Sequence, residues 1–327
     1  MKENIIKAVI NKIIYILAIT VGVFICFLTV YPDTTVLLPF QYILFFTPRY
    51  IYFFVILYLC FQWRNAKNIK RIVLTLLLFI SIYLLDFQFN INTKADYEQK
   101  KSTFTLVSIN IGEGIELKHL MSIIRFQDPD IFTLQEAGRM KNIDELESYP
   151  FQDCKGNLCL ISKYPFEKVN SFNNNMYKGY GDWAAFYKVD INDIQINLAN
   201  VHFPSVRRIF PRFDGIKELH QNRTLSALLI DDWAQSKQNV IITGDFNMSV
   251  IEGTYQQTFK KYQNALSDVG SGFNNTVDYK YRGIGLPGIR IDHILLSKNF
   301  NLEKAVVLET LGGDHYPIFS SISLKEH

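Results

Sequence analysis

Residues 13–30 form an unbroken apolar run without a charged side chain, IIYILAITVGVFICFLTV. A transmembrane helix needs about 20 predominantly apolar residues, so this run is long enough to cross a bilayer. Two further apolar runs lie within residues 36–63 and 72–85. A cleaved signal peptide would account for the first run only, and the runs are too uniformly apolar for the amphipathic helices of a soluble bundle. The sequence therefore predicts a membrane region over residues 1–89 with about three transmembrane helices.

Positive charges in the short loops predict the orientation of these helices. Three lysines precede the first run, and Arg64, Lys67, Lys70 and Arg71 lie between the second and third runs. The stretch YPDTT between the first and second runs has no lysine or arginine. Because positive loop residues stay on the cytoplasmic side, we expect the N-terminus in the cytoplasm. Three crossings then make the chain a multi-pass protein of the cell (inner) membrane with an extracytoplasmic C-terminal domain.

The charge balance differs between the two parts of the chain. Residues 1–89 carry eight Lys or Arg and three Asp or Glu, a net charge of +5. Residues 90–327 carry 26 Lys or Arg and 28 Asp or Glu, a net charge of −2. Sequence-independent binding of nucleic acid depends on neutralising phosphates with lysine and arginine. Nucleic acid is therefore a less favoured partner than a membrane lipid or a lipid-linked phosphate.

Two cysteines of the C-terminal part, Cys154 and Cys159, flank a turn in CKGNLC. In an oxidising compartment they can form a disulfide across this hairpin. Spacing alone does not fix the geometry that a disulfide needs, so two free thiols are an equal alternative.

Residues 90–102 are polar and charged and predict a linker, and residues 103–327 predict a single domain. In this domain, stretches typical of strands, such as FTLVSIN, CLISKYPF (residues 159–166) and IQINLANVHF, interleave with stretches of helical spacing. This mixed order with many strands predicts an α+β layered domain of two packed sheets flanked by helices.

Several predicted strands begin or end in polar residues that core packing does not explain. These residues are Asn110, Glu136, His202, Asp245 with Asn247, Asp292, and Asp314 with His315. Each one alone fits an ordinary turn, a surface acid or a satisfied core histidine. Separate turns would not independently select the same set of hard oxygen ligands and imidazoles. We therefore expect these strand ends to converge on one polar rim.

The ordered motifs SIN, QEA, NVH, GDFN, RIDHIL and GGDHYP resemble those of the endonuclease/exonuclease/phosphatase superfamily. This superfamily includes DNase I-like nucleases, abasic-site endonucleases, sphingomyelinases and inositol-polyphosphate phosphatases. The resemblance runs from about residue 104 to residue 323. It implies a four-layered α/β sandwich, with the site at one rim of two stacked sheets, and metal-dependent hydrolysis at phosphorus. It does not specify the substrate.

The resemblance also implies a metal site at the rim. Glu136 would be the main metal ligand, with Asn110 and Asp314 nearby. Carboxylate and amide oxygens suit a hard cation, so Mg²⁺ is the expected cofactor and Mn²⁺ is an alternative.

Five residues are expected to act on the phosphate and on the attacking water. Asp245 and Asn247 would position and activate the water, and His202 would hold a phosphate oxygen. His315 would meet the phosphate, and Asp292 would orient it as an aspartate orients a catalytic imidazole. The resemblance leaves the general base open between Asp245 and His315. A two-metal scheme in which Asp245 and Asn247 are ligands also fits.

A basic cluster follows His202. Arg207, Arg208 and Arg212 in PSVRRIFPR can contact phosphate in a bidentate manner and are predicted to bind substrate. A solvated basic loop is the alternative, since surface arginines are common.

The membrane region favours a substrate at the bilayer surface. Apolar spans before this domain resemble bacterial membrane proteins linked to glycopeptide (teicoplanin) resistance. That resemblance implies a phosphatase of a lipid-linked (polyprenyl) diphosphate. A membrane-tethered exported nuclease and a phospholipase C- or sphingomyelinase-like phosphodiesterase are the alternatives. A catalytically silent anchored binding module fits the full set of rim residues least well.

Overall fold

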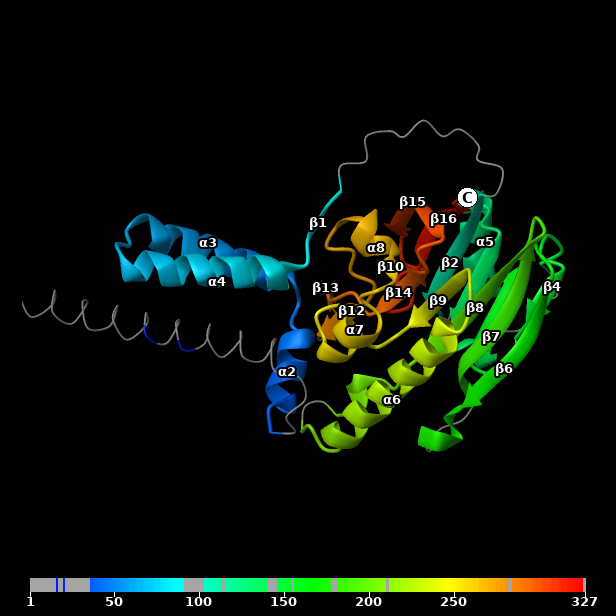
Figure 1. Ribbon diagram of the computed structural model, residues 1–327, viewed down its shortest axis with the longest axis horizontal. Coiled ribbons are helices and arrows are strands. Elements are labelled where there is room, and N and C mark those ends of the chain that lie inside the picture. Colours follow the sequence, from blue (N-terminus) through cyan, green and yellow to red (C-terminus); the bar gives the residue numbers. More distant parts are fainter. Residues whose placement is uncertain are drawn as a thin grey trace, which may run out of the picture. The chain divides into compact units, whose positions relative to one another are not determined.

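The structure is a computed structural model that divides into two compact units (Figure 1). One unit holds the chain up to Phe87 with Ile251–Gly253, and the other holds Gln88–Val250 with Thr254–His327. Apart from Ile16 and Thr20, the predicted first span lies outside the described residues, as does the predicted linker after Asn90. The residues that the structure describes are Ile16, Thr20, 36–90, 103–112, 116–139, 146–154, 156–177, 181–209, 212–281 and 284–325.

The first unit contains three short apolar helices, α2 (Leu38–Phe45), α3 (Tyr50–Arg64) and α4 (Ile69–Leu85). α3 and α4 pack on one another through Leu59, Ala66, Leu74 and Leu77. In the part of the chain that the structure describes, no single helix has the length and apolarity needed to cross a membrane. α2 and α3 meet that requirement only as a pair, and they are bent by 92° at the break between them.

The break between α2 and α3 has a local cause at Pro48 and Arg49. Proline cannot donate a backbone hydrogen bond and disfavours helical backbone at the residue before it, so α2 ends. Arg49 then turns its guanidinium back, and Nη2 donates to the Phe45 carbonyl at 2.9 Å and Nη1 to the Leu44 carbonyl at 3.4 Å. A cation at the last carbonyls of a helix satisfies acceptors that the helix leaves open. The second apolar run of the sequence therefore forms two helices.

The second unit is built on two six-stranded sheets. The first sheet has the order β15 (Phe300–Val307), β16 (Ile318–Leu324), β2 (Thr103–Asn110), β3 (Ile131–Gln135), β5 (Leu158–Ser162), β4 (Phe151–Asp153). The second has the order β10 (Gln263–Asn264), β14 (Asp292–Leu296), β9 (Val240–Asp245), β8 (Ile194–His202), β7 (Asp182–Ile191), β6 (Phe166–Asn173). Within these sheets β2–β3 and β8–β9 are parallel pairs, and the other neighbours are antiparallel.

Smaller elements complete this unit. Two further strand pairs are β1 (Gln88–Phe89) with β11 (Ser271–Gly272) and β12 (Asp278–Tyr281) with β13 (Ile284–Pro287). The helices are α5 (Leu117–Gln127), α6 (Ile216–Gln235), α7 (Gly253–Thr258) and α8 (Ala265–Asp268). Short 3-10 turns are η1 (Ala137–Arg139), η3 (Asn174–Tyr177) and η4 (Val206–Arg208).

Alternation of side chains along the strands builds the layers of the second unit. On the facing sides of the two sheets, Leu106 of β2 shares one apolar core with Ile241 of β9. On its other face, β2 contributes Val107 to a second core that includes Leu120 of α5. The outer face of the second sheet meets α6, where the rings of Phe186 and Trp233 are 4.7 Å apart. The order helix, sheet, sheet, helix confirms the predicted α+β sandwich (Figure 1).

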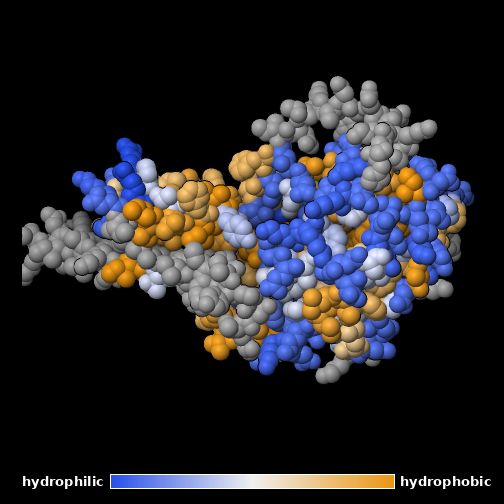
Figure 2. All heavy atoms as spheres, viewed as in Figure 1, coloured by the Kyte–Doolittle hydropathy of each residue, from blue (hydrophilic) through white to orange (hydrophobic). Residues whose placement is uncertain are grey.

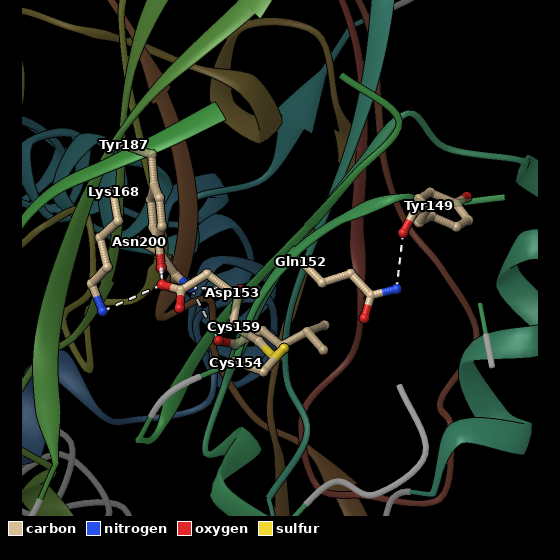
Figure 3. The surroundings of a disulfide bond; sticks show 9 residues. Tyr149, Gln152, Asp153, Cys154, Cys159, Lys168, Tyr187 and Asn200 are labelled. Atoms are coloured by element: carbon tan, nitrogen blue, oxygen red, sulfur yellow. Dashed lines mark hydrogen bonds and ion pairs between the residues drawn. A yellow bond between two sulfur atoms is a disulfide. The ribbon is translucent and has the colours of Figure 1, made fainter. Parts of the chain in front are cut away.

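Element boundaries differ from the sequence-based expectation in a few places. The predicted strand over residues 159–166 is two strands, β5 and β6, because Ser162 ends the ladder with β3 and Pro165 follows. The hairpin of β12 and β13 has no counterpart in the prediction. The structure also joins Cys154 to Cys159 in a disulfide beside the β4–β5 hairpin, which decides between the two alternatives for this pair (Figure 3).

At Gly244, in the centre of the second sheet, the backbone of the neighbouring strand lies too close for a side chain. Its φ is 137°, and a Cβ built there would lie 2.0 Å from the Val201 carbonyl oxygen of the neighbouring strand β8. We expect Gly244→Ala to destabilise the chain by about 3 kcal/mol or more, measured as a large fall in the thermal unfolding midpoint of the purified chain.

Gly215→Ala is the matched control for this substitution. Gly215 also has a positive φ, 73°, but among the described residues nothing lies within 4 Å of a Cβ built there. Alanine at this position should cost only the strain of a left-handed backbone, about 1–2 kcal/mol. Equal falls in the two variants would contradict the crowding at Gly244.

Candidate active site

The polar residues predicted at strand ends meet at one edge of the two sheets. β2 ends at Asn110, β8 at His202 and β9 at Asp245, while β14 begins at Asp292 and Glu136 follows β3. The parallel pairing of β8 with β9 sets His202 opposite Asp245. The antiparallel pairing of β9 with β14 sets Asp292 opposite Asp245 on the other side. Asp245 is therefore at the centre of the group in the second sheet.

Strand alternation decides which way these side chains point. Asn110 follows Leu106 by four residues, and Asp245 follows Ile241 by four, and both apolar residues lie in the core between the sheets. Residues an even number apart on a strand share a face. The site residues therefore point between the two sheets, at the edge where the apolar core ends.

A layer of neutral polar pairs, here called the polar floor, separates the apolar core from the charged rim. Thr133 Oγ1 and Thr243 Oγ1 lie 3.2 Å apart, and Gln135 Nε2 donates to Asn200 Oδ1 at 2.7 Å. Each pair joins β3 of the first sheet to a strand of the second, and all four residues are fully buried. A buried polar group without a partner costs about 1–3 kcal/mol. The floor therefore ties the two sheets together directly beneath the site.

One amide links the carboxylates of the two sheets. Asn110 Nδ2 donates to Glu136 Oε1 and to Asp245 Oδ2, both at 3.0 Å, and Asn110 Oδ1 accepts from the Gly112 N–H at 3.0 Å. His202 Nε2 lies 3.6 Å from the same two carboxylate oxygens. Asp245 is buried, whereas the Glu136 side chain is 39% exposed. Glu136 therefore offers the solvent-facing carboxylate of this cluster, and Asp245 offers the enclosed one.

His315 and Asp292 form a buried ion pair next to this cluster. His315 Nδ1 lies 3.0 and 3.1 Å from the two Asp292 oxygens, and the Asp292 backbone N–H donates to Thr276 Oγ1 at 3.1 Å. Burial alone lowers the pKa of His315, but the carboxylates of Asp292 and Asp245 outweigh it and raise the pKa to about 9. His315 is thus an imidazolium at neutral pH in this environment. Its Nε2, 3.8 Å from Asp245 Oδ2, is a hydrogen-bond donor.

Asn247 is held in a left-handed backbone conformation, with a φ of 48°. Its N–H donates to Asp245 Oδ1 at 2.8 Å, and its Nδ2 donates to the Phe203 carbonyl at 3.1 Å. Arg223, buried on α6, donates from its guanidinium to the Asn247 carbonyl. Arg223 is a site-supporting residue that sequence reasoning missed. Its only sequence signal is a cation among the apolar positions of a helix.

His293 has a structural role although it lies inside the RIDHIL motif. Its Nε2 donates to the Met248 carbonyl at 2.8 Å, and its Nδ1 accepts from Asn264 Nδ2 at 3.1 Å. Burial lowers the pKa of His293 to about 3, so the ring is neutral. These two hydrogen bonds use both ring nitrogens of His293. The residue therefore holds the loop after Asp245 in place and offers no nitrogen to the rim.

The predicted basic cluster contributes one arginine to the site. Arg207 Nη2 lies 2.5 Å from Asp314 Oδ2 and 3.4 Å from His315 Nε2. Asp314 is thus paired with a cation here, and its predicted role as a metal ligand stays a prediction. Arg212 is exposed, and the side chain of Arg208 lies outside the described residues.

The donor set at the rim fits a divalent cation. Asp245, Asp292 and His315 each offer an atom within 4.8 Å of the others, but His315 Nδ1 and both Asp292 oxygens are already paired with each other. Glu136 with Asn110 is the better location, because the carboxylate is open to solvent and oxygen ligands suit Mg²⁺ or Mn²⁺. Asn110 turns its amide nitrogen to the carboxylates, so ligation through its oxygen stays a prediction.

Comparison with known proteins identifies a family for the chain. Residues 88–315 match the model of the Endonuclease/Exonuclease/phosphatase family. No curated protein sequence matches the chain. The members of this family hydrolyse phosphoester bonds and depend on divalent metals.

Solved structures of this fold resemble the chain at low sequence identity. D. rerio TDP2 complexed with single-strand DNA product is 17% identical with a TM-score of 0.53, over 68% of this chain and 99% of that one. Caenorhabditis elegans TDP2 is 19% identical with a TM-score of 0.52, over 68% and 74% of the two chains. An endonuclease/exonuclease/phosphatase from Beutenbergia cavernae is 12% identical with a TM-score of 0.52, over 68% and 72%. These likenesses show the fold alone. The family match, over more than half of the chain, shows that the chain belongs to the endonuclease/exonuclease/phosphatase family.

Proposed function

We propose that the chain is a metal-dependent phosphohydrolase at the outer surface of the cell membrane, acting on a lipid-linked (polyprenyl) diphosphate. The observation that carries the proposal is a pair of donors at the rim. Arg207 Nη2 and His315 Nε2 lie 3.4 Å apart, and with His315 protonated neither of them accepts a hydrogen bond from the other. An oxygen of a phosphate group between them would accept from both.

The chemistry of the site supports hydrolysis at phosphorus. Asp245 and Asn247 are placed to hold a water and to take its proton, while His315 and Arg207 hold phosphate oxygens. The water oxygen bonds to the terminal phosphorus, the bridging P–O bond breaks, and inorganic phosphate and the lipid monophosphate leave. A divalent cation held by Glu136 and its neighbours would supply charge neutralisation on the phosphate when bound.

The hairpin of α3 and α4 supports a membrane location. Large apolar side chains are exposed on both helices, among them Phe54 at 63%, Phe61 at 66% and Phe79 at 67% (Figure 2). A patch of this kind marks contact with a membrane or a partner. At the turn of the hairpin, Arg71 lies over the Trp63 ring at 4.5 Å, and Trp63 Nε1 donates to Thr75 Oγ1 at 3.0 Å. A tryptophan beside basic residues is typical of a helix end at the membrane interface.

A membrane location would also suit the substrate. The lipid tail can stay in the bilayer while the diphosphate enters the rim, and confinement to the surface raises its effective concentration. The tethered-nuclease alternative draws support from the fold shared with D. rerio TDP2, solved with single-strand DNA product. The net charge of −2 over residues 90–327 argues against it.

The rim residues should be essential for turnover. We expect Glu136→Gln, Asp245→Asn and His315→Ala each to lower kcat by about 10² to 10⁴-fold, because each removes a group that acts on phosphate, water or metal. Glu167→Gln, on an exposed residue of β6, is the control and should retain the wild-type rate. Near-normal rates in any two of the three rim variants would show that the site is elsewhere.

The substrate assignment is tested on the detergent-solubilised chain. It should release inorganic phosphate from undecaprenyl diphosphate with Mg²⁺ or Mn²⁺, and a chelator should abolish the release. Sphingomyelin and plasmid DNA are the competing substrates. Efficient DNA degradation without phosphate release would favour the nuclease, and phosphocholine release the phosphodiesterase.

Two arginine variants sharpen this assay. Arg207→Gln should lower kcat/KM for the diphosphate by about tenfold or more, since hydrogen bonds to charged groups contribute about 1.5–3 kcal/mol. Arg212→Gln is the matched control with the same change of charge. An equal loss in both variants would indicate a general charge effect rather than contact by Arg207.

The orientation is tested with reporter fusions. A reporter active only outside the cytoplasm should be active when fused after His327 and inactive when inserted near Asn68, in the basic turn of the hairpin. The opposite pattern would overturn the extracytoplasmic location and leave the family assignment untouched.

A further inference from the structure

The segment that carries Glu136 leaves the first sheet at the end of β3. Gln135 is the last residue of β3 in the ladder with β5, where its partner is Leu158. Glu136 then takes a φ of 55°, a left-handed conformation that a residue with a long side chain keeps only when its surroundings hold it. The next residue is anchored again, because the Ala137 N–H donates to the Asn157 carbonyl at 2.9 Å. The position of Glu136 therefore depends on the turn that contains Asn157.

This turn is packed tightly against two glycines. A Cβ at Gly138 would lie 3.0 Å from Asn157 Oδ1 and 3.1 Å from the Gly156 carbonyl oxygen. A Cβ at Gly181 would lie 2.9 Å from Asn157 Nδ2. Asn157 thus fits between two backbone segments that leave no room for a side chain. A small shift of the turn would move the segment after Glu136 with it.

The Cys154–Cys159 disulfide closes this turn. The two Cα atoms are 4.2 Å apart, and the disulfide lies just beyond Asp153 and Leu160, the last pair of the β4–β5 ladder toward the turn. Cys159 is fully buried in the second core, the one that lies between the first sheet and α5 and that also contains Ala137. Cys154 packs against the same core. The disulfide therefore anchors both ends of the turn to the core beside the Glu136 segment.

A second connection runs through the polar floor. Asn200 Nδ2 donates to the Cys159 carbonyl at 3.0 Å (Figure 3). Asn200 Oδ1 accepts from Gln135 Nε2 at 2.7 Å. Cys159 is thus tied through one side chain to Gln135, the residue before Glu136, while the turn holds Ala137, the residue after it.

We infer that the Cys154–Cys159 disulfide positions Glu136 for metal binding, so that the metal site is complete only when the cysteines are oxidised. The inference rests on the proposed role of Glu136 as a metal ligand. It makes the disulfide a positioning element for the rim and ties activity to an oxidising compartment.

Reduction is a two-electron exchange with a dithiol. One thiolate of the dithiol attacks Sγ of the half-buried Cys154, and the Cys159 thiolate leaves. The second dithiol sulfur then displaces Cys154, so that one S–S bond breaks in the protein and one forms in the reagent. Both cysteines take up a proton. The turn then loses its covalent closure and is held by hydrogen bonds and packing, which open more readily.

Hydrogen exchange and metal binding test the inference on the full chain in detergent. Dithiothreitol should speed amide exchange in the peptide spanning residues 131–139 and leave the peptide of β9 unchanged. It should also weaken Mn²⁺ binding, measured by titration, by about tenfold, as changes around a metal ligand typically do. Glu136→Gln should weaken Mn²⁺ binding by at least as much, which verifies that the titration reports on this site.

Two variants separate positioning from general stability. Cys154→Ala with Cys159→Ala should reproduce the weak Mn²⁺ binding and should no longer respond to dithiothreitol. Cys60→Ser, on the exposed free cysteine of α3, should respond as the wild type does. Unchanged Mn²⁺ affinity and unchanged exchange over residues 131–139 after reduction would overturn the inference, as would free thiols at both positions in the purified chain. Absence of prenyl-diphosphate hydrolysis with a redox-sensitive Mn²⁺ site would overturn only the proposed substrate.

Discussion

The side-chain amide of Asn110 joins one carboxylate from each sheet, and the geometry of the site depends on that bridge. Its nitrogen is 3.0 Å from Glu136 of the first sheet and 3.0 Å from Asp245 of the second. Two carboxylates this close repel, and a single donor offsets only part of that cost. The remaining negative charge is what a divalent cation and the imidazolium of His315 can balance. The same repulsion between the two carboxylates thus favours binding of a divalent cation.

The space between the sheets changes in character along the strands. It begins with Leu106 and Ile241, continues with the polar floor, and ends in the charged rim. At the rim, the buried carboxylate of Asp245 accepts from the Asn110 amide and from the Asn247 N–H; without such donors its burial would cost several kcal/mol. The neutral polar floor thus lies between the apolar core and the charged rim, so that polarity rises in steps. It also leaves the rim rigid, since every layer below it is held by both sheets.

The strand ends were predictable from the sequence because each one combines a local strand signal with a polar residue at a fixed place. Asp245 and Asp292 show this, since alternation from a buried isoleucine sets the direction of both side chains. The contact of Arg207 with Asp314 was not predictable, because 107 residues separate the two and neither belongs to a strand. The polar floor was not predictable either, because its partners are also far apart in the sequence. A threonine such as Thr133 is common in any strand, and its hydrogen-bond partner comes from the second sheet. Pro48 in the sequence indicated a break in the second apolar run. The angle of the bend was not predictable, because it depends on how Arg49 caps the helix that precedes it.

The polar floor also bears on how the two sheets find their alignment during folding. An interface of branched aliphatic side chains alone tolerates several docking registers with similar energies. A slip by one residue pair, about 7 Å along the strands, would separate Thr133 from Thr243 and Gln135 from Asn200. Four buried groups would then lack partners, at about 1–3 kcal/mol each. A chain with its two sheets docked in the wrong register would therefore be unstable whatever the rim residues do. Selection of the correct register needs neither metal nor substrate.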